Sequence, residues 1–487
     1  MVSQAYLGNS RNGIKGDNVY EKIVGDLFPH LICDEPAESP SEKLMQAIWF
    51  NQRIKRGELK TLQGIKVKVL HPGFFNSEAG PDFKNAIIQF GSEKPIQGDV
   101  EIDSKVSDWK SHSHYNNPDY SKVVLQVVWE SPEGSENSMP VMPLKRFLES
   151  PLAILEDTVG IDIAEQFPAT LEGVCSKYFK NYTDERRKKF LEEAALFRLE
   201  QKSLQVVARA RESSFEQALW ELLFRALGYK NNIWAFQCLG ELRPIILNHS
   251  LEEPLQLEAR LFGLSGLLPA ELTYIEPEND SRLKTLWDYW WREQEAFNEF
   301  VLPGTIWRLS GTRPANHPHR RLALAARWLF ENSLHNEFLN WLKTATTATM
   351  EESFLNILTP QEDPFWNWHY SVRSKKTASA QPLIGADRAT DIAINVVLPW
   401  LLAVSRENFD RETENRVIEF YLKWKPSQDN ALLKLARKRL FGALQEIAQT
   451  AAMQQGIIQI VKNFCENSDS VCTGCKFPSK LEQYYYS

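Results

Sequence analysis

The chain lacks any long hydrophobic segment. No apolar run approaches the roughly 20 residues needed to cross a bilayer, and the polar amino terminus has no signal-peptide core. A strict internal repeat and a low-complexity tract are also missing from the sequence. These absences predict a cytoplasmic protein that makes no contact with a membrane.

Positive charge is also scarce. The 487 residues include 56 lysines and arginines against 63 aspartates and glutamates, which gives a net charge of -7. This balance does not favour nucleic-acid binding, although an acidic nuclease can carry a local basic surface. With 43% hydrophobic and 24% charged residues, the composition is that of an ordinary soluble protein. Its length predicts two or three domains and a sizeable core.

The sequence pattern changes along the chain. Residues 1–40 are polar and rich in proline towards their end, and we expect them to form a loosely held arm. Residues 41–160 combine a helical stretch with short strand-like runs. In residues 161–460 apolar side chains recur at helical spacing, and residues 461–487 form a cysteine-rich end. The expected fold is α+β, a small mixed sheet followed by a large all-α domain.

Acidic residues accompany two adjacent strand-like runs. Asp82 precedes the apolar run 83–90, and Asp99, Glu101 and Asp103 alternate with apolar residues in the next run. Because successive side chains of a strand point to opposite faces, these last three carboxylates share one face. Their mutual repulsion is tolerable if that face is fully solvated or if a cation neutralises it. The pattern alone leaves both explanations open.

A hairpin of these two runs would bring the carboxylate of Asp82 near that of Glu101. Mg²⁺ needs only one or two carboxylates, a backbone carbonyl and substrate phosphate oxygens as ligands. Asp82, Glu101 and the carbonyl of Ile102 could supply that set for phosphodiester hydrolysis. A solvated edge strand beside a turn aspartate explains the spacing equally well, since short acidic patterns are weakly specific.

Residues 42–130 resemble the PD-(D/E)XK nuclease superfamily through Pro81-Asp82, a spacer and Glu101-Ile102-Asp103. That superfamily presents an aspartate at one strand and Glu-X-Lys on the next, often with a glutamate from a preceding helix. Glu42 matches that glutamate, in a helical stretch that Ser41 would cap. The resemblance implies a nuclease dependent on Mg²⁺ or Mn²⁺ at Asp82 and Glu101, acting on DNA in preference to RNA.

The chain departs from the superfamily at Asp103, which stands where the lysine is expected. A lysine there would orient water and stabilise charge in the transition state, and an aspartate cannot. Lys105 or Lys84 would have to reach in from a neighbouring position. Otherwise the protein is a degenerate nuclease fold that binds nucleic acid or serves as a scaffold. Hydrolysis of carbohydrate by paired carboxylates is a third alternative, for which the sequence places no sugar-binding cleft.

Nearly the whole chain also resembles a bacterial family known only as a domain of unknown function. The resemblance lies in a set of short motifs spread over the chain: Trp49-Phe50-Asn51-Gln52, residues 76–83, Gly98-Asp99-Val100-Glu101-Ile102, Ser107-Asp108-Trp109, Tyr120, residues 123–128, Arg313-Pro314, residues 394–399 and the terminal cysteines. The resemblance leads us to expect histidine at the positions of Asp103 and Gln126. It implies kinship and no established activity.

Two histidines follow the acidic run in a polar, turn-rich stretch. His112 and His114 lie between the acidic strand and the next apolar run, close in sequence to the proposed metal site. A neutral imidazole can bind a metal or act as a general base near neutral pH. Exposed loop histidines without such a role, or with a phosphate contact only, are the alternative.

Three of the six cysteines crowd the carboxyl end. Cys465, Cys472 and Cys475 are separated by six and then two residues. In a cytosolic chain such thiolates bind metal more readily than they form disulfides. Some PD-(D/E)XK nucleases have a similar layout, with one upstream and three downstream cysteines on an iron-sulfur cluster, and Cys33 would be the upstream ligand here. Zinc and uncoordinated thiols remain alternatives.

A basic, proline-interrupted stretch spans residues 307–321. It contains His317 and His319 and ends on Arg320 and Arg321. A loop followed by a helix start places guanidinium groups beside backbone amides, which suits a phosphate. A loop that only connects two helices is the alternative.

Overall fold

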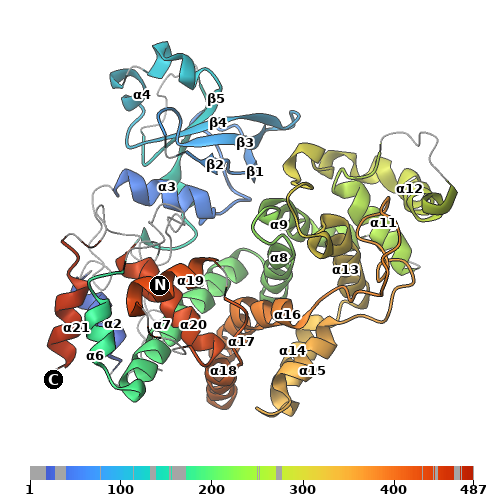
Figure 1. Cartoon of the computed structure of the whole chain (residues 1–487). Helices are drawn as coiled ribbons and strands as arrows, with labels where there is room; N and C mark the ends of the chain where they lie inside the picture. The colour runs from blue at the N-terminus through green and yellow to red at the C-terminus, as the bar shows by residue number, and fades with distance from the viewer. Residues whose placement is uncertain are drawn as a thin grey trace. The chain divides into compact units, whose positions relative to one another are not determined.

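Strands between residues 67 and 143 pair into one six-stranded sheet in the computed structural model of the chain (Figure 1). The strands are β1 (Val67–His71), β2 (Phe74–Phe75), β3 (Phe83–Phe90), β4 (Ile96–Asp103), β5 (Val123–Val128) and β6 (Val141–Pro143). The structure describes residues 18–27, 40–76, 78–112, 114–131, 139–152, 155, 172–248, 251, 253–269, 277–429, 431–442, 444, 448–465, 472 and 474–485.

The strand order is β1-β3-β4-β5-β6, with β2 paired to β3. The pairs that involve β3 are antiparallel, whereas β4 with β5 and β5 with β6 are parallel. The sheet is therefore mixed, as the sequence predicts. The expected hairpin is confirmed, because β3 and β4 pair with Phe83 opposite Val100. Gly91 in their connection has a φ of 55°, a conformation that glycine adopts at little cost.

The predicted helix before the sheet is also confirmed. Helix α3 (Glu42–Asn51) begins after Ser41, whose side chain accepts a hydrogen bond from the amide of Leu44. Its apolar residues share one hydrophobic core with the sheet: Met45, Ile48, Trp49, Val100, Ile102, Leu125 and Val127 are all members. α3 and β4 are thereby held by the same buried apolar surface.

The chain divides into two compact units. Unit 1 comprises Met1–Ala208 with Leu402–Ser487, and unit 2 comprises Arg209–Leu401. Unit 1 therefore contains the sheet and also helices from both ends of the chain. The domain boundaries expected at residues 160 and 460 stay a prediction.

A second core of unit 1 is helical. Its helices are α2 (Val19–Leu27), α6 (Ser176–Asn181), α7 (Asp184–Glu212), α19 (Ala431–Phe441), α20 (Ala451–Phe464) and α21 (Phe477–Tyr485), and α18 (Arg411–Lys423) packs on α20. α2 lies within the stretch expected to be a loosely held arm, yet Tyr20 is fully buried in this core. The carboxylate of Glu193 accepts a hydrogen bond from the amide of Val19 at 3.0 Å, which fixes the first turn of α2.

Unit 2 is built from helices. They are α8 (Phe215–Leu227), α9 (Ile233–Glu241), α10 (Arg243–Leu247), α11 (Pro254–Leu264), α12 (Pro277–Phe297), α13 (Pro318–Glu331), α14 (Leu334–Thr344), α15 (Met350–Leu358), α16 (Ala386–Ile392) and the first residues of α17 (Leu398–Glu407). The described residues thus confirm a mixed sheet followed by a large helical region. The PD-(D/E)XK fold itself stays a prediction.

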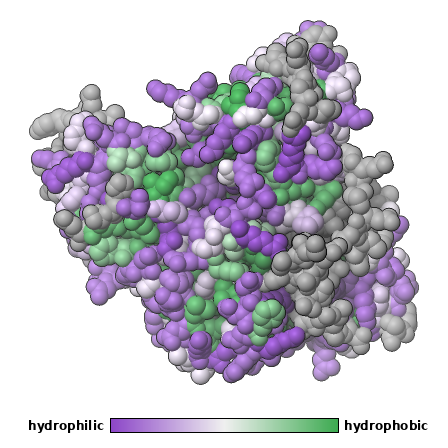
Figure 2. All heavy atoms as spheres, turned by 180° about the vertical axis from the view of Figure 1, so that it is seen from behind, coloured by the Kyte–Doolittle hydropathy of each residue, from purple (hydrophilic) through white to green (hydrophobic). Residues whose placement is uncertain are grey.

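One segment, Ala386–Glu407, is long and apolar enough to cross a membrane by length and composition. It consists of α16, the π-helical stretch Ala393–Val397 and α17. Of its most apolar window, 72% is buried inside the protein, which is the environment of a core helix. Figure 2 shows one face of the molecule, on which hydrophobic residues lie in separate patches among hydrophilic ones.

Candidate metal centre

Helix α3 and the start of β3 bring three polar side chains together. Gln46 lies one helical turn after Glu42, so both side chains project from the same face of α3. The Gln46 Nε2 amide donates to Asp82 Oδ1 at 2.9 Å and to Glu42 Oε1 at 3.3 Å. Gln46 therefore links the helix glutamate to the strand aspartate.

Asp82 and Glu101 are joined through the backbone of the hairpin. The amide of Asp82 donates to Glu101 Oε2 at 3.1 Å, and the amide of Ile102 donates to Asp82 Oδ2 at 2.9 Å. Each carboxylate is thus bonded to a backbone amide on the strand that carries the other. The two side chains therefore lie beside one another across the hairpin, and their binding of one cation stays a prediction.

The acidic face of β4 is buried. Asp99, Glu101 and Asp103 are 7%, 6% and 3% exposed, and β4 lies between β3 and β5. The solvated edge strand that the sequence also allowed is therefore wrong. Asp99 stands apart from the other two, since its Oδ1 accepts a hydrogen bond from the amide of Asn85 at 2.9 Å.

Burial raises the pKa of three carboxyls at this site, those of Asp82, Glu101 and Asp103. The pKa of Asp82 rises to about 7 through burial, with Glu42 and Asp103 adding to the rise. Burial raises the pKa of Glu101 to about 9, and the nearby charges of Asp82 and Asp103 contribute. Burial also raises the pKa of Asp103 to about 6. Buried carboxylates that repel one another take up protons unless a cation replaces those protons.

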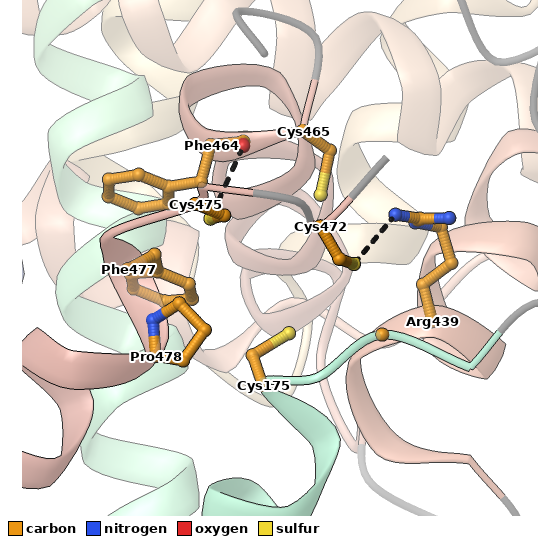
Figure 3. Close-up of a pocket in the computed structure, with 9 residues that line it drawn as sticks. Cys175, Arg439, Phe464, Cys465, Cys472, Cys475, Phe477 and Pro478 are labelled. Carbon is orange, nitrogen blue, oxygen red and sulfur yellow. Dashed lines mark hydrogen bonds between the residues drawn. The ribbon is translucent and has the colours of Figure 1, made fainter. Parts of the chain in front are cut away.

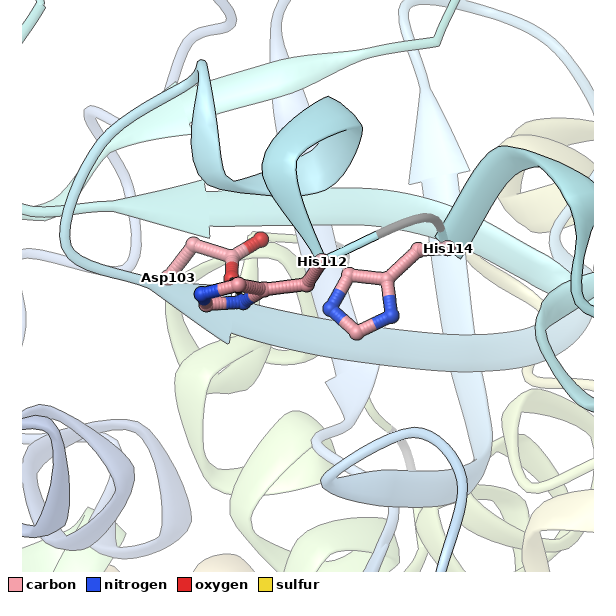
Figure 4. Close-up of side chains that lie close together, drawn as sticks. All are labelled: Asp103, His112 and His114. Atoms are coloured by element: carbon pink, nitrogen blue, oxygen red, sulfur yellow. Dashed lines mark ion pairs between the residues drawn. The ribbon is translucent and has the colours of Figure 1, made fainter.

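A second set of potential ligands adjoins these carboxylates. Asp103, His112 and His114 each place one ligand atom within 4.8 Å of the other two, so this group could hold a metal ion (Figure 4). His114 Nε2 lies 3.4 Å from Glu101 Oε1, and His112 Nδ1 lies 3.9 Å from Asp103 Oδ1. The histidines therefore extend the acidic cluster, and the carboxylates of Glu101 and Asp103 connect its two parts.

The environment of His114 suits a metal ligand. Its ring stacks on that of Tyr120 with centroids 4.0 Å apart, which fixes the plane of the imidazole. Burial and the neighbouring His112 lower the pKa of His114, which favours the neutral ring that binds metals. Its Nε2 is buried and has no hydrogen-bond partner within the described residues. An unsatisfied buried nitrogen beside a carboxylate is a specific reason to expect a cation there.

Gln126 holds Asp103 from the neighbouring strand. Its Nε2 donates to Asp103 Oδ2 at 2.7 Å, and Gln126 is fully buried. The two residues at which the family resemblance leads us to expect histidine are therefore direct partners here. The sequence predicts no role for Gln46, and it singles out Gln126 and Tyr120 only through the family resemblance. For Gln46, the available signal was its position four residues after Glu42 on the same expected helix.

Lys105 is one of the two residues that could stand in for the missing lysine. It follows β4, its side chain is exposed, and only its backbone amide has a recorded partner, Asp108, among the described residues. Its predicted catalytic role stays untested. Cys33, proposed as a cluster ligand, lies outside the described residues.

The basic stretch before α13 does not present its last two arginines to a phosphate. Arg320 and Arg321 are 0% and 3% exposed, and their guanidinium groups donate to backbone carbonyls. Burial lowers the pKa of Arg321 to about 10. The phosphate-binding interpretation is therefore wrong for these two residues, which hold the fold of unit 2 instead.

The fold and the site together define an α+β protein with a buried acidic and histidine cluster able to hold a divalent metal at its sheet. Residues 42–430 match the family described as Protein of unknown function (DUF2851), and the chain belongs to that family. No curated protein matches the chain, and no solved structure matches it.

The raised pKa values predict that metal-free protein loses stability as the pH rises. A carboxyl whose pKa is higher in the folded state than the ordinary value near 4 binds protons more tightly in the folded protein. Its contribution to stability is therefore complete below about pH 4 and is lost as the pH rises to the folded-state pKa. We expect the free energy of unfolding to fall by several kcal/mol between about pH 5 and about pH 9 in EDTA. Saturating Mn²⁺ at the upper pH should restore about 3 kcal/mol.

Thermal or urea unfolding at several pH values measures this effect. The double variant Asp82→Asn with Glu101→Gln carries no charge at two of these positions, so it should lose most of the pH dependence, with Asp103 accounting for the remainder, and the response to Mn²⁺. Equal pH dependence in the variant and in the natural chain would contradict the assignment of these carboxyls.

Proposed function

We propose that the protein is a metal-dependent nuclease that hydrolyses phosphodiester bonds of nucleic acid, DNA in preference to RNA. The observation that carries the proposal is the convergence of the half-buried Asp82 and the buried Glu101 and Asp103 with His114 around β4. An aspartate at the start of one strand, a glutamate on the next and a glutamate from the preceding helix is also the arrangement of the superfamily that residues 42–130 resemble.

Asp82 and Glu101 would hold the ion, and Gln46 orients Asp82 through its hydrogen bond to Oδ1. A bound Mg²⁺ or Mn²⁺ supplies charge neutralisation and the capacity to activate water for attack on phosphorus. Imidazole ligands suit Mn²⁺ better than Mg²⁺, so participation of His114 favours Mn²⁺. The apolar core behind Val100 and Ile102 keeps water from the other face of β4.

In this proposal the two histidines replace the missing lysine, which would orient water and stabilise charge in the transition state. His112 is exposed beside Asp103, so its ring can face a substrate phosphate. The neutral His114 can accept a proton from attacking water. The five described cysteines form no disulfide, which suits a reducing compartment, and we place the protein in the cytoplasm.

Cleavage assays with the purified full-length chain test this proposal. Labelled single- and double-stranded DNA and RNA of one sequence are incubated with Mg²⁺, Mn²⁺ or EDTA. We expect cleavage of DNA with Mn²⁺, weaker cleavage with Mg²⁺ and none in EDTA. Absence of cleavage of all four substrates with either ion would overturn the enzyme assignment.

The alternative function is that of a catalytically degenerate nuclease fold that binds nucleic acid or acts as a scaffold. The substitution of the superfamily lysine by Asp103, with Lys105 exposed, is the observation that favours it. This alternative predicts DNA binding that is measurable by fluorescence anisotropy and unchanged by EDTA, without cleavage under any of the conditions above.

A further inference from the structure

Four cysteines line one small cavity in the helical part of unit 1 (Figure 3). Cys175 directly precedes α6, Cys465 follows the last residue of α20, and Cys472 and Cys475 lie between α20 and α21. The cavity measures about 20 Å³, room for roughly one water molecule among the thiols. Residues far apart in the sequence therefore bring four soft ligand atoms to one place.

The positively charged side chain of Arg439 lies at the edge of this cavity. The Arg439 guanidinium on α19 donates from Nη2 to Cys472 Sγ at 3.6 Å. Burial raises the pKa of Cys465 to about 11, while the positive charge of Arg439 opposes the rise. Burial raises the pKa of Cys175, and the neighbouring Cys465, Cys472 and Cys475 add to the rise. Such a group is stable as thiolates only if further positive charge enters.

The backbone around the cavity is shaped to keep the thiols together. The amide of Gly173 donates to the carbonyl of Arg439 at 2.9 Å, which ties the turn before Cys175 to the end of α19. A Cβ at Gly173 would lie 3.0 Å from that carbonyl oxygen and 3.3 Å from Cys175 Sγ. Cys472 has a φ of 64°, a left-handed conformation that a residue with a Cβ adopts at a cost.

The surroundings of the thiols are apolar. Phe464 and Phe477 line the cavity with Pro478, and the two phenyl rings stack with centroids 4.0 Å apart. An apolar shell of this kind excludes water and strengthens the attraction between thiolates and a metal. The four cysteines thus have the ligand number, the chemistry and the enclosure of a structural metal site.

We propose that Cys175, Cys465, Cys472 and Cys475 together hold a thiophilic metal centre, either an iron-sulfur cluster or a zinc ion. Both take four thiolate ligands, and both occur with a Cys-X-X-Cys pair such as residues 472 and 475. Cys175 completes the set, so the centre needs no contribution from Cys33. The centre would link α6 to the segment between α20 and α21. It would thereby connect the two parts of the chain, residues 1–208 and 402–487, that form unit 1.

Metal analysis of the full-length chain, purified without oxygen from cells supplied with iron and zinc, tests this inference. An iron-sulfur cluster gives about two to four iron atoms with equal sulfide per chain and visible absorption that dithionite bleaches. Zinc gives about one atom per chain and no visible band. Either stoichiometry supports the four-cysteine site. Protein without either metal, which also fails to take up Zn²⁺ or iron with sulfide, overturns it.

Single serine variants identify the ligands. Cys175→Ser and Cys472→Ser should each lower the metal content at least tenfold and lower the thermal midpoint of unfolding. Cys238→Ser is the matched control, because Cys238 is buried in α9 of unit 2 and does not line the cavity, and it should keep the full metal content. Full metal content in Cys175→Ser together with its loss in Cys33→Ser would overturn the assignment, whatever the stability of the variants.

Discussion

Replacing Asp82 by Asn, or Glu101 by Gln, is expected to lower the rate of Mn²⁺-dependent DNA cleavage at least about 100-fold. Groups that hydrogen-bond to the ligands of a metal typically contribute about 10- to 100-fold, and a direct ligand contributes more. Each substitution removes one negative charge and preserves the shape of the side chain. The amide of Ile102 can still donate to residue 82, so the hairpin should keep its fold.

Asp99→Asn is the matched control for these variants. Asp99 lies on β4 two residues before Glu101 and is equally buried, but it accepts from the amide of Asn85 and takes no part in the cluster. Its substitution should change the cleavage rate by less than about threefold, an effect of well under 1 kcal/mol. Equal losses in Asp99→Asn and Asp82→Asn would show that the strand, and not the proposed ion, determines the activity.

Replacing Arg320 by Met is expected to destabilise unit 2 by about 4 kcal/mol or more. Arg320 is completely buried and donates to the carbonyls of Trp366, His369, Gln381 and Pro382 at 2.6 to 3.1 Å. A hydrogen bond to a charged group contributes about 1.5–3 kcal/mol, and each buried acceptor left without a donor costs about 1–3 kcal/mol. Methionine fills part of the volume but provides no donor.

Urea unfolding followed by tryptophan fluorescence measures this loss, since Trp366 is buried beside the bonded carbonyls. Arg313→Met is the control, because Arg313 is exposed at the start of the same basic stretch, and its substitution should change stability by less than about 0.5 kcal/mol. Similar stability of Arg320→Met and the natural chain would contradict the structural role of the buried guanidinium.

Local sequence signals were sufficient for the parts of the site that depend on neighbours in the chain. Ser41 predicts the start of α3, and the alternation around Glu101 predicts a strand with one apolar and one acidic face. Both features follow from backbone periodicity and from capping, which need only a few adjacent residues. The hairpin then brings Asp82 to Glu101 because the two strands are consecutive.

Features that depend on tertiary contacts could not be predicted from local sequence signals. Cys175 joins Cys465, Cys472 and Cys475 only because α6 packs against the carboxyl-terminal helices in one core. Spacing between cysteines that are distant in the sequence carries no signal for such contact, and Cys33 was therefore proposed as the fourth ligand.

The basic stretch at residues 307–321 is a second feature that depends on tertiary contacts and was not predicted correctly from the sequence. Arginines are rarely buried without a partner, so a run ending on Arg320 and Arg321 favours an exposed, phosphate-binding loop. The carbonyls that satisfy them come from residues 366–383, beyond α15 in the chain. Only the fold of unit 2 shows that these two guanidinium groups are buried and already donate to backbone carbonyls.

An anomalous-scattering map of crystals grown with Mn²⁺ tests the central claim most directly. The account predicts a peak at about 2 Å from oxygen atoms of both Asp82 and Glu101. It also predicts that this peak vanishes in the Asp82→Asn, Glu101→Gln double variant. A map at saturating Mn²⁺ without a peak there, with the two carboxylates turned away from one another, would contradict the account.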